Sequence, residues 1–242
     1  MKKYFISSDI HGFFTKWMLE LTNKGFDINN KDHIIIICGD IIDRGKETDK
    51  IIDFLYDFPE DRRILIMGNH EELFCDMIYR GYPQSIDYSN GTYETYKLLY
   101  KKEEIFEISR FEKTKLSRLI DQMINFYETN NYVFVHGWIP LSENWRNENI
   151  DHWHNARWLN GIKQNIMGNN IPNKTIVCGH IPSIYGNLYK EYGKNAFIDS
   201  DKKIINHPEL NTIYKNNGII CLDCNTFLTS HIEVLVLTEE EI

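Results

Sequence analysis

The 242-residue sequence contains no apolar stretch long enough to cross a lipid bilayer. Its first residues, "MKKYFIS", lack the longer apolar run of a signal peptide, so we expect a cytoplasmic protein with no membrane partner. Cysteine is also scarce. The chain has five cysteines, an odd number, and they are scattered along the sequence. That distribution argues against the disulfide framework of a small secreted domain and is typical of core cysteines in a reducing compartment.

Positive charge is in deficit as well. The chain has 27 Lys and Arg residues against 35 Asp and Glu residues, which gives a formal net charge of −8. Such a chain has no global basic field with which to bind nucleic acid non-specifically, and we expect no nucleic-acid partner. Repeats, low-complexity tracts and linker-like segments are absent too, so we expect one domain over residues 1–242.

The early part of the chain alternates short apolar runs with amphipathic stretches. Strands are predicted at "KKYFIS", "DHIIIIC" and "RRILIM", with helices over residues 14–21 and over "TDKIIDFLYDF", and a third helix beginning near Glu71. This βαβ alternation predicts an α/β protein whose sheet begins with parallel strands.

The later part of the chain changes character. Residues 92–130 are polar and aromatic with helical periodicity, and we interpret them as a helical insertion or cap. Five further apolar runs follow and predict more strands: "YVFVHG", "KTIVCGH", "NAFIDS", "NGIICLDC" and "HIEVLVL".

Polar residues end five of the strand-like runs. They are Asp9 and His11 in "SDIHG", Asp40, Asp43 and Arg44 in "GDIIDRG", Asn69 and His70 in "GNHE", His136 in "HG" and His180 in "GH". In α/β sheets, residues beyond the carboxyl ends of strands converge on a ligand although they are distant in sequence. Any one such residue is usually turn chemistry. Five together predict a site for a metal such as zinc, manganese or iron, which accept carboxylate, imidazole and amide oxygen.

The order of these motifs resembles that of the binuclear metallophosphoesterases, and within them the phosphoprotein phosphatases of serine/threonine phosphatase-like, bacterial or phage type. The family pattern is G-D-x-H-G, G-D-x-x-D-R-G, G-N-H-E and two later histidines, and the Arg-Gly pair is specific to the phosphoprotein phosphatase branch. The chain departs from the pattern at Ser8, where glycine is usual, and at Cys224-Asn225, where threonine-glycine is usual. The resemblance implies the calcineurin-like fold, a four-layer αββα sandwich of two mixed β-sheets flanked by helices.

The resemblance also implies a site with two divalent metal ions. Manganese is the first expectation, with iron or zinc as alternatives. The implied metal ligands are Asp9, His11, Asp40, Asn69, His136 and His180, with Asp40 bridging the two ions. A metal-bound hydroxide would be the nucleophile of phosphoester hydrolysis, because two ions can clamp a phosphoryl group and activate water.

Four residues complete the implied chemistry. His70 resembles the family's general acid, and Asp43 would orient its imidazole. Arg44 and Asn69 would contact the substrate phosphate. A second arginine suited to phosphate is Arg157 in "HNARWLNGI", which lies between the two late histidines.

The substrate stays open at this level, because it depends on loops. One hypothesis is a serine/threonine protein phosphatase-like phosphomonoesterase acting on a phosphorylated protein or on small phosphoesters. The alternative is a dinucleoside polyphosphate hydrolase, such as a diadenosine tetraphosphate hydrolase, with a nucleotide cleft. A non-catalytic binding module would require a broken site, whereas every expected ligand is present.

Three other features receive structural interpretations. His152 and His154 in "DHWH" are expected in a loop or at the rim of the site. The "CLDC" pair lies in a β-like run without partner cysteines, so neither a zinc site nor a redox pair is expected, and Asp223 within it is interpreted as a turn residue. The aromatic residues could line a base-binding cleft, but core packing is their more common use.

Overall fold

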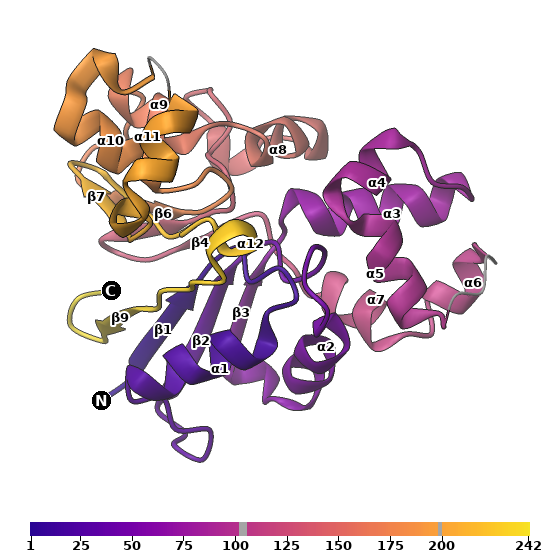
Figure 1. The fold of residues 1–242 in the computed structure, drawn as a ribbon. Coiled ribbons are helices and arrows are strands. Elements are labelled where there is room, and N and C mark those ends of the chain that lie inside the picture. The colour runs from indigo at the N-terminus through magenta and orange to yellow at the C-terminus, as the bar shows by residue number, and fades with distance from the viewer. Residues whose placement is uncertain (102–105, 198–199) are drawn as a thin grey trace.

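The structure is a computed structural model that describes residues 1–101, 106–197 and 200–242. Two β-sheets stack face to face, and helices cover the outer face of each sheet (Figure 1). The four layers confirm the αββα architecture that the motifs implied. Among the described residues, no helix is both long enough and apolar enough to span a membrane.

The first sheet has the strand order β3-β2-β1-β9. Strands β1 (Lys3–Ser7), β2 (His33–Cys38) and β3 (Arg63–Ile66) are parallel, as the βαβ alternation predicted. Strand β9 (Leu235–Thr238) pairs with β1 in the antiparallel direction.

The second sheet has the order β4-β5-β6-β8-β7. Its three central strands are parallel, and an antiparallel strand closes each edge. The bounds are β4 (Tyr127–Glu128), β5 (Tyr132–Phe134), β6 (Thr175–Cys178), β7 (Tyr214–Asn216) and β8 (Ile219–Cys221).

Strand β2 is apolar throughout because both of its faces are covered. Ile34 and Ile36 point into the core between the two sheets. Ile35 and Ile37 point to the other face, into the core formed with the helices. Side chains alternate along a strand, so a central strand with two covered faces shows a continuous apolar run instead of an alternating one.

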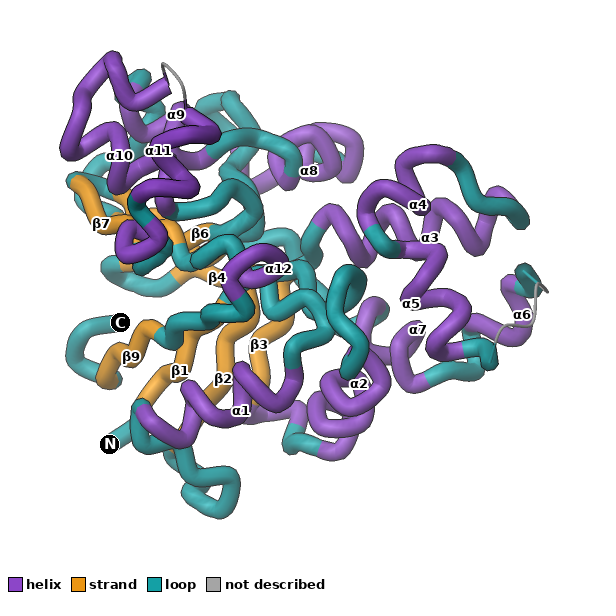
Figure 2. Tube along the Cα trace, viewed as in Figure 1, coloured by secondary structure: helices purple, strands orange, loops and turns teal. Residues whose placement is uncertain are grey.

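Helices form the two outer layers, as the purple segments of Figure 2 show. The first sheet is covered by α1 (Phe14–Asn23), α2 (Thr48–Asp57), α3 (Asn69–Arg80) and α7 (Lys115–Ile120). On the side of the second sheet lie α8 (Ile150–Arg157), α9 (Gly161–Ile166), α10 (Ile184–Tyr192) and α11 (Ser200–Asn206). Short 3-10 turns lie at Glu60–Arg62, Trp145–Asn147, Gly193–Phe197 and Pro208–Leu210, and a short helix α12 spans Thr226–Thr229.

The helical insertion begins earlier than predicted. It starts with α4 (Ser85–Asn90) and continues through α5 (Thr92–Leu99), α6 (Ile108–Phe111) and α7, while residues 102–105 lie outside the described part. The chain then returns to the first sheet, because Ile124 bonds to β3 through the backbone of Leu65 and Met67. The last part of the predicted helical stretch is therefore extended.

The strand predicted at "NAFIDS" was wrong. Asn195 to Phe197 belong to a 3-10 turn, Ser200 begins α11, and residues 198–199 lie outside the described part. Ala196 packs with Ile184 and Leu188 of α10 in a small core of its own. The run therefore finds its apolar partners on a helix, and strand β7 occupies the nearby sheet edge.

The cysteines agree with the expectation of core residues. All five are free, and four of them are buried, whereas Cys75 is half-buried.

Candidate metal centre

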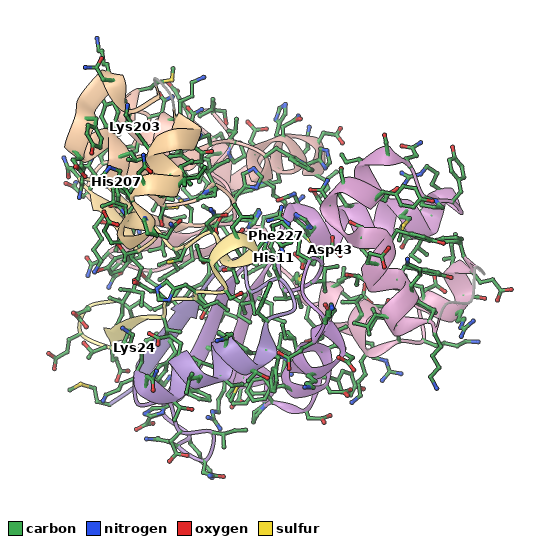
Figure 3. The ribbon with its side chains drawn as sticks, viewed as in Figure 1. His11, Lys24, Asp43, Lys203, His207 and Phe227 are labelled. Carbon is green, nitrogen blue, oxygen red and sulfur yellow. The ribbon has the colours of Figure 1, made fainter. Side chains whose placement is uncertain are left out.

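The predicted polar residues gather where the carboxyl ends of both sheets meet. Figure 3 shows His11, Asp43 and Phe227 close to this junction, whereas Lys203 and His207 lie far from it. Asp9 and His11 follow β1, Asp40 follows β2, Asn69 and His70 begin α3 after β3, His136 follows β5, and His180 follows β6. The convergence predicted from five separate motifs is thus present.

The backbone around the site is strained. Of the non-glycine residues with positive φ, six belong to the predicted site: Asp9, His11, Asp40, Asp43, Arg44 and His180. Residues other than glycine rarely adopt a positive φ, and such backbone strain clusters at functional sites. Main-chain hydrogen bonds hold it in place, since the N–H of His11 donates to the carbonyl of Asp40 at 2.9 Å.

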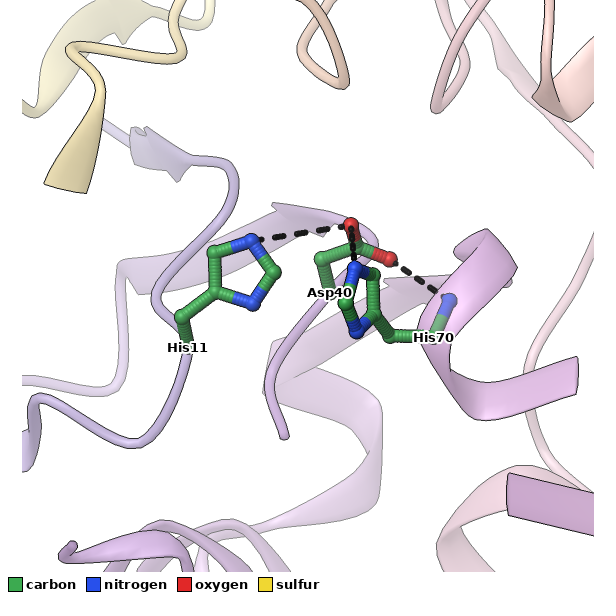
Figure 4. A group of neighbouring side chains, drawn as sticks. All are labelled: His11, Asp40 and His70. Atoms are coloured by element: carbon green, nitrogen blue, oxygen red, sulfur yellow. Dashed lines mark hydrogen bonds and ion pairs between the residues drawn. The ribbon is translucent and has the colours of Figure 1, made fainter. Parts of the chain in front are cut away.

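Asp40 lies at the middle of the site (Figure 4). Its Oδ1 accepts a hydrogen bond from the backbone N–H of His70 at 3.0 Å and lies 3.4 Å from Nε2 of His136. Its Oδ2 lies 3.8 Å from Nε2 of both His11 and His70. Two groups with metal-binding spacing share this carboxylate, namely His11 with His70 and His136 with His180.

Asn69 joins the two late histidines. Its Oδ1 lies 2.7 Å from Nε2 of His136 and 2.9 Å from Nδ1 of His180. The amide oxygen, the two imidazoles and Asp40 therefore surround one small volume.

The donor chemistry of the site fits a cation. Nδ1 of His11 bonds to the carbonyl oxygen of Ile42 at 3.0 Å, and Nδ1 of His136 bonds to that of Cys38 at 2.8 Å. A ring nitrogen that donates to a carbonyl leaves the other nitrogen with its lone pair, which is the arrangement of metal-binding histidines. In both rings that second nitrogen faces oxygen acceptors at the centre. Only a cation or an added proton can satisfy such a set.

Burial shifts the protonation of the same groups. It raises the pKa of Asp40 well above its usual range, with further raising by the charges of Asp9 and Glu71. It raises the pKa of Asp9 to about 6, and it lowers the pKa of His136 to about 4 and that of His180 to about 3. The imidazoles are thus neutral, and the carboxylates have too little positive charge nearby. A bound cation would supply that charge.

Asp9 lies at the side of the site, and Ser8 supports it. Nε2 of His11 is 3.9 Å from Oδ1 of Asp9, while Oδ2 accepts the backbone N–H of His180 at 3.0 Å. The Ser8 hydroxyl lies 2.5 Å from the same Oδ2. Serine in place of the usual glycine therefore adds a contact to Asp9. The Ser8 hydroxyl has room because residue 179 is a glycine, where a Cβ would lie 1.8 Å from the Ser8 oxygen.

His70 lies between an acid and an arginine. Its Nδ1 is 2.7 Å from Oδ2 of Asp43, and its Nε2 is 3.2 Å from Nη2 of Arg44. Arginine can only donate, so Nε2 carries the lone pair and Nδ1 carries the proton. Burial and the charge of Arg44 lower the pKa of His70, and burial raises the pKa of Asp43 to about 7.

Arg157 already has protein partners. Its guanidinium is buried, forms an ion pair with Glu72 and donates to the side-chain oxygen of Asn125. Phosphate binding by Arg157 stays a prediction, and it would require the guanidinium to exchange or share these partners.

The sequence analysis missed the part played by Glu71. This fully buried carboxylate, on the first turn of α3, accepts the backbone N–H groups of Asp40 at 3.0 Å, Ile41 at 2.9 Å and Gly68 at 3.0 Å. It therefore fixes the turn after β2 against the turn after β3. The signal was present as the last letter of "GNHE", but two of the three donors, on Asp40 and Ile41, are 31 and 30 positions away from Glu71.

The remaining polar features lie outside the site. His152 pairs with Glu148 and His154 pairs with Glu72, both as exposed side chains. Asp223 accepts the backbone N–H of Asn225 at 2.7 Å through Oδ1, which is the turn chemistry expected of it.

A pocket of about 900 Å³ opens beside the site. Its lining includes Arg44, Lys46, Lys97 and Lys101 as cations, and Tyr88 and Phe227 as aromatic residues. Helices α4 and α5 of the insertion form one wall of this pocket.

Comparison with known proteins identifies relatives of the chain. Residues 2–220 match the sequence model of the family described as calcineurin-like phosphoesterase. The symmetrical bis(5'-nucleosyl)-tetraphosphatase of Buchnera aphidicola subsp. Acyrthosiphon pisum (strain 5A) is 37% identical over 71 residues, covering 29% of this chain and 24% of that protein. The asymmetrical bis(5'-nucleosyl)-tetraphosphatase PrpE of Bacillus subtilis (strain 168) is 27% identical over 136 residues, covering 52% of this chain and 50% of that protein.

The match therefore spans between a quarter and a half of the length of these curated relatives. Among solved structures, a cold-active protein tyrosine phosphatase superimposes with a TM-score of 0.61 at 17% identity, covering 99% of this chain and 75% of that chain. At this identity the likeness shows a shared fold and nothing finer.

We predict that Asp40→Asn abolishes metal binding. The pKa of Asp40 is raised in the folded state, so above its unfolded pKa the charged carboxylate costs stability, and the metal-free variant has a higher melting temperature than the metal-free wild type at pH 8. Manganese raises the melting temperature of the wild type but not that of the variant. Asp61→Asn, at an exposed carboxylate, is the control. Manganese-dependent stabilisation of Asp40→Asn equal to that of the wild type contradicts the assignment.

We also predict that Glu71→Gln destabilises the protein. The side-chain N–H group of the new glutamine would face the backbone N–H groups that now donate to Glu71. The lost hydrogen bonds cost about 1–3 kcal/mol in the free energy of unfolding measured with urea. The matched change Glu20→Gln affects a residue whose carboxylate pairs with Lys24 near the surface, and it costs less than about 0.5 kcal/mol. Equal losses in the two variants contradict the organising role of Glu71.

Proposed function

The chain belongs to the calcineurin-like phosphoesterase family, and on that premise we propose that it is a phosphoric ester hydrolase whose substrates are dinucleoside polyphosphates. The observation that carries the proposal is the pocket beside the metal centre, which combines cations with exposed aromatic rings. The two relatives that are named bis(5'-nucleosyl)-tetraphosphatases support the same substrate class.

Two divalent ions, with manganese as the first choice, would occupy the centre. Asp9, His11 and Asp40 would hold one ion, and Asp40, Asn69, His136 and His180 would hold the other. Such ions supply positive charge that lowers the pKa of water and offsets the charge of a phosphoryl group. The lone pairs that converge on Asp40 and Asn69 support this assignment.

In the proposed reaction, His70 donates a proton to the leaving oxygen. Water gives up a proton to solvent and the resulting hydroxide forms the new bond to phosphorus, while the bond to the leaving oxygen breaks. His70 acts in its protonated form, and the proton on its Nε2 passes to the leaving oxygen. Asp43 holds Nδ1, so that Nε2 faces the reacting group. Arg44 now donates to Nε2, and it would turn to the anionic phosphate when substrate binds. The anion then offsets the charge of Arg44, which raises the pKa of His70 and prepares it as an acid.

The pocket matches the rest of such a substrate. Lys46, Lys97 and Lys101 place positive charge around it, and Glu94, which also lines the pocket, offsets one of these charges through its ion pair with Lys97. With Arg44 the lining keeps an excess of positive charge although the whole chain is acidic, and this local field favours a polyanion. The Phe227 ring is 52% exposed and lies beneath the Arg44 guanidinium at 5.7 Å. An exposed ring beside a cation provides a stacking surface for a nucleobase.

The serine/threonine phosphatase-like activity stays a prediction beside this one. A phosphorylated side chain would need only the metal centre and the arginines. Substrate preference therefore separates the two activities.

We expect manganese-loaded protein to hydrolyse diadenosine tetraphosphate with a higher kcat/KM than a phosphoserine peptide. His70→Asn lowers kcat by ~10²–10⁴-fold, because the leaving oxygen loses its proton donor, while bound manganese stays at the wild-type level. His152→Asn, at an exposed histidine that pairs with Glu148, keeps wild-type kinetics. A higher kcat/KM for the peptide supports the phosphatase activity instead, and full activity of His70→Asn removes His70 from the mechanism.

We further expect Phe227→Ala to raise KM for diadenosine tetraphosphate. Loss of base stacking of about 1–3 kcal/mol corresponds to roughly 5- to 150-fold, whereas p-nitrophenyl phosphate, which has no nucleobase, is affected less. Leu228→Ala is the matched control, because Leu228 is 70% exposed on the same short helix and is not among the pocket-lining residues. Equal KM changes for the two substrates argue against a nucleobase at Phe227.

A further inference from the structure

The helical insertion contacts Asp43, the residue that orients His70, through a direct hydrogen bond. The hydroxyl of Thr92, the first residue of α5, donates a hydrogen bond of 2.7 Å to Oδ2 of Asp43. The same Oδ2 lies 2.7 Å from Nδ1 of His70. Thr92 and Asp43 are fully buried, and His70 is nearly so. One carboxylate oxygen therefore receives both donors in a place that water does not reach.

We propose that Thr92 is a positioning residue, through which the insertion holds Asp43 in the orientation that fixes the tautomer of His70. This inference rests on the proposed role of His70 as proton donor. It gives the insertion a task beyond forming a wall of the pocket.

The hydroxyl of Thr92 is not required by its own helix. The N-cap of α5 is Gly91, which has no side chain, and the Thr92 hydroxyl points instead across to Asp43. Threonine at the start of a helix commonly bonds back to nearby backbone groups. Here the hydroxyl bonds to a residue 49 positions earlier in the chain.

The turn that carries Asp43 needs support from outside. Asp43 and Arg44 have φ values of 71° and 65°, which are unfavourable for residues with a Cβ. Gly91 lies directly against this turn, since a Cβ there would come 2.9 Å from the backbone nitrogen of Arg44. Gly91 also has a positive φ of 84°, so glycine suits this position for two reasons. The junction of α4 and α5 thus packs against the strained turn, and Thr92 donates a hydrogen bond to Asp43 in that turn.

The consequence for His70 follows from hydrogen-bond chemistry. A carboxylate oxygen that faces Nδ1 selects the tautomer with the proton on Nδ1 and leaves Nε2 facing the reacting group. If the Thr92 hydroxyl is lost, Asp43 keeps one donor instead of two on this oxygen. The buried Thr95 hydroxyl on the same helix interacts with this carboxylate and has no other hydrogen-bond partner, so it can draw the carboxylate away from Nδ1 of His70. His70 then samples other orientations, and proton donation from Nε2 becomes less efficient.

Three variants test the proposal. Thr92→Val keeps the shape but removes the hydroxyl, and Thr92→Ser keeps the hydroxyl. Thr114→Val is the matched control, because the Thr114 side chain accepts the backbone N–H of Ser117 as the N-cap of α7 in the same insertion, without contact to Asp43. Loss of this cap reports what destabilising the insertion alone does.

The first measurement uses no turnover. Spectra of metal-free protein with ¹⁵N-labelled histidine give the tautomer of His70, whose signal is identified by its loss in His70→Asn. We expect an Nδ1-protonated ring in the wild type, Thr92→Ser and Thr114→Val. In Thr92→Val we expect shifts toward a mixture of tautomers. A wild-type His70 signal in Thr92→Val overturns the proposal.

The second measurement compares leaving groups in the manganese-loaded protein. For Thr92→Val, kcat with phenyl phosphate falls about tenfold, a part of the ~10²–10⁴-fold that general acid catalysis supplies, and kcat with p-nitrophenyl phosphate changes little because its leaving group needs no proton. KM stays at the wild-type value for both. Thr92→Ser restores the wild-type ratio. Equal losses for the two esters, or the same pattern in Thr114→Val, overturn the proposal. If the wild type hydrolyses neither ester and also leaves diadenosine tetraphosphate intact, the proposed function fails, and the spectra alone decide the role of Thr92.

Discussion

The buried carboxylate of Asp40 is the point at which the two sheets meet. It follows β2 of the first sheet, accepts the backbone N–H of His70 on α3, and lies 3.4 Å from His136, which follows β5 of the second sheet. A charge in this position is unfavourable unless it is compensated, and burial keeps the neighbouring imidazoles neutral. The arrangement of the strand ends therefore makes sense as a built site for a cation.

The glycines of the motifs have a physical reason in the same contact. A Cβ at Gly68 would come 2.2 Å from Oδ1 of Asp40, and a Cβ at Gly39 would come 2.5 Å from Nδ1 of His136. The side chains of the centre can approach the backbone only where a Cβ is missing. Glu71 then fixes the two turns to each other through their N–H groups. The motif letters thus encode a close approach of the backbone as well as ligands.

Local features made the site predictable, and long-range pairings limited the prediction. The short apolar runs place the strand ends, and parallel strands bring those ends to one edge, so the convergence of Asp9, Asp40 and His180 follows from the sequence. The ion pair of Arg157 with Glu72 does not follow, because the two residues are 85 positions apart. The strand prediction at "NAFIDS" was wrong for a similar reason. An isolated apolar run can pack against a helix or join a sheet, and its local sequence does not decide between the two.

Helix α5 connects the lining of the pocket with the proposed proton donor His70. Its buried side carries Thr92, which bonds to Asp43, and its other side carries Lys97 and Leu98, which line the pocket. Because an α-helix rises 1.5 Å per residue and bends little over two turns, these two sides move together. A polyanion drawn toward Lys97 would act on the helix that bonds to Asp43. The insertion therefore offers a direct physical route by which the part of the substrate that does not react can affect the orientation of His70.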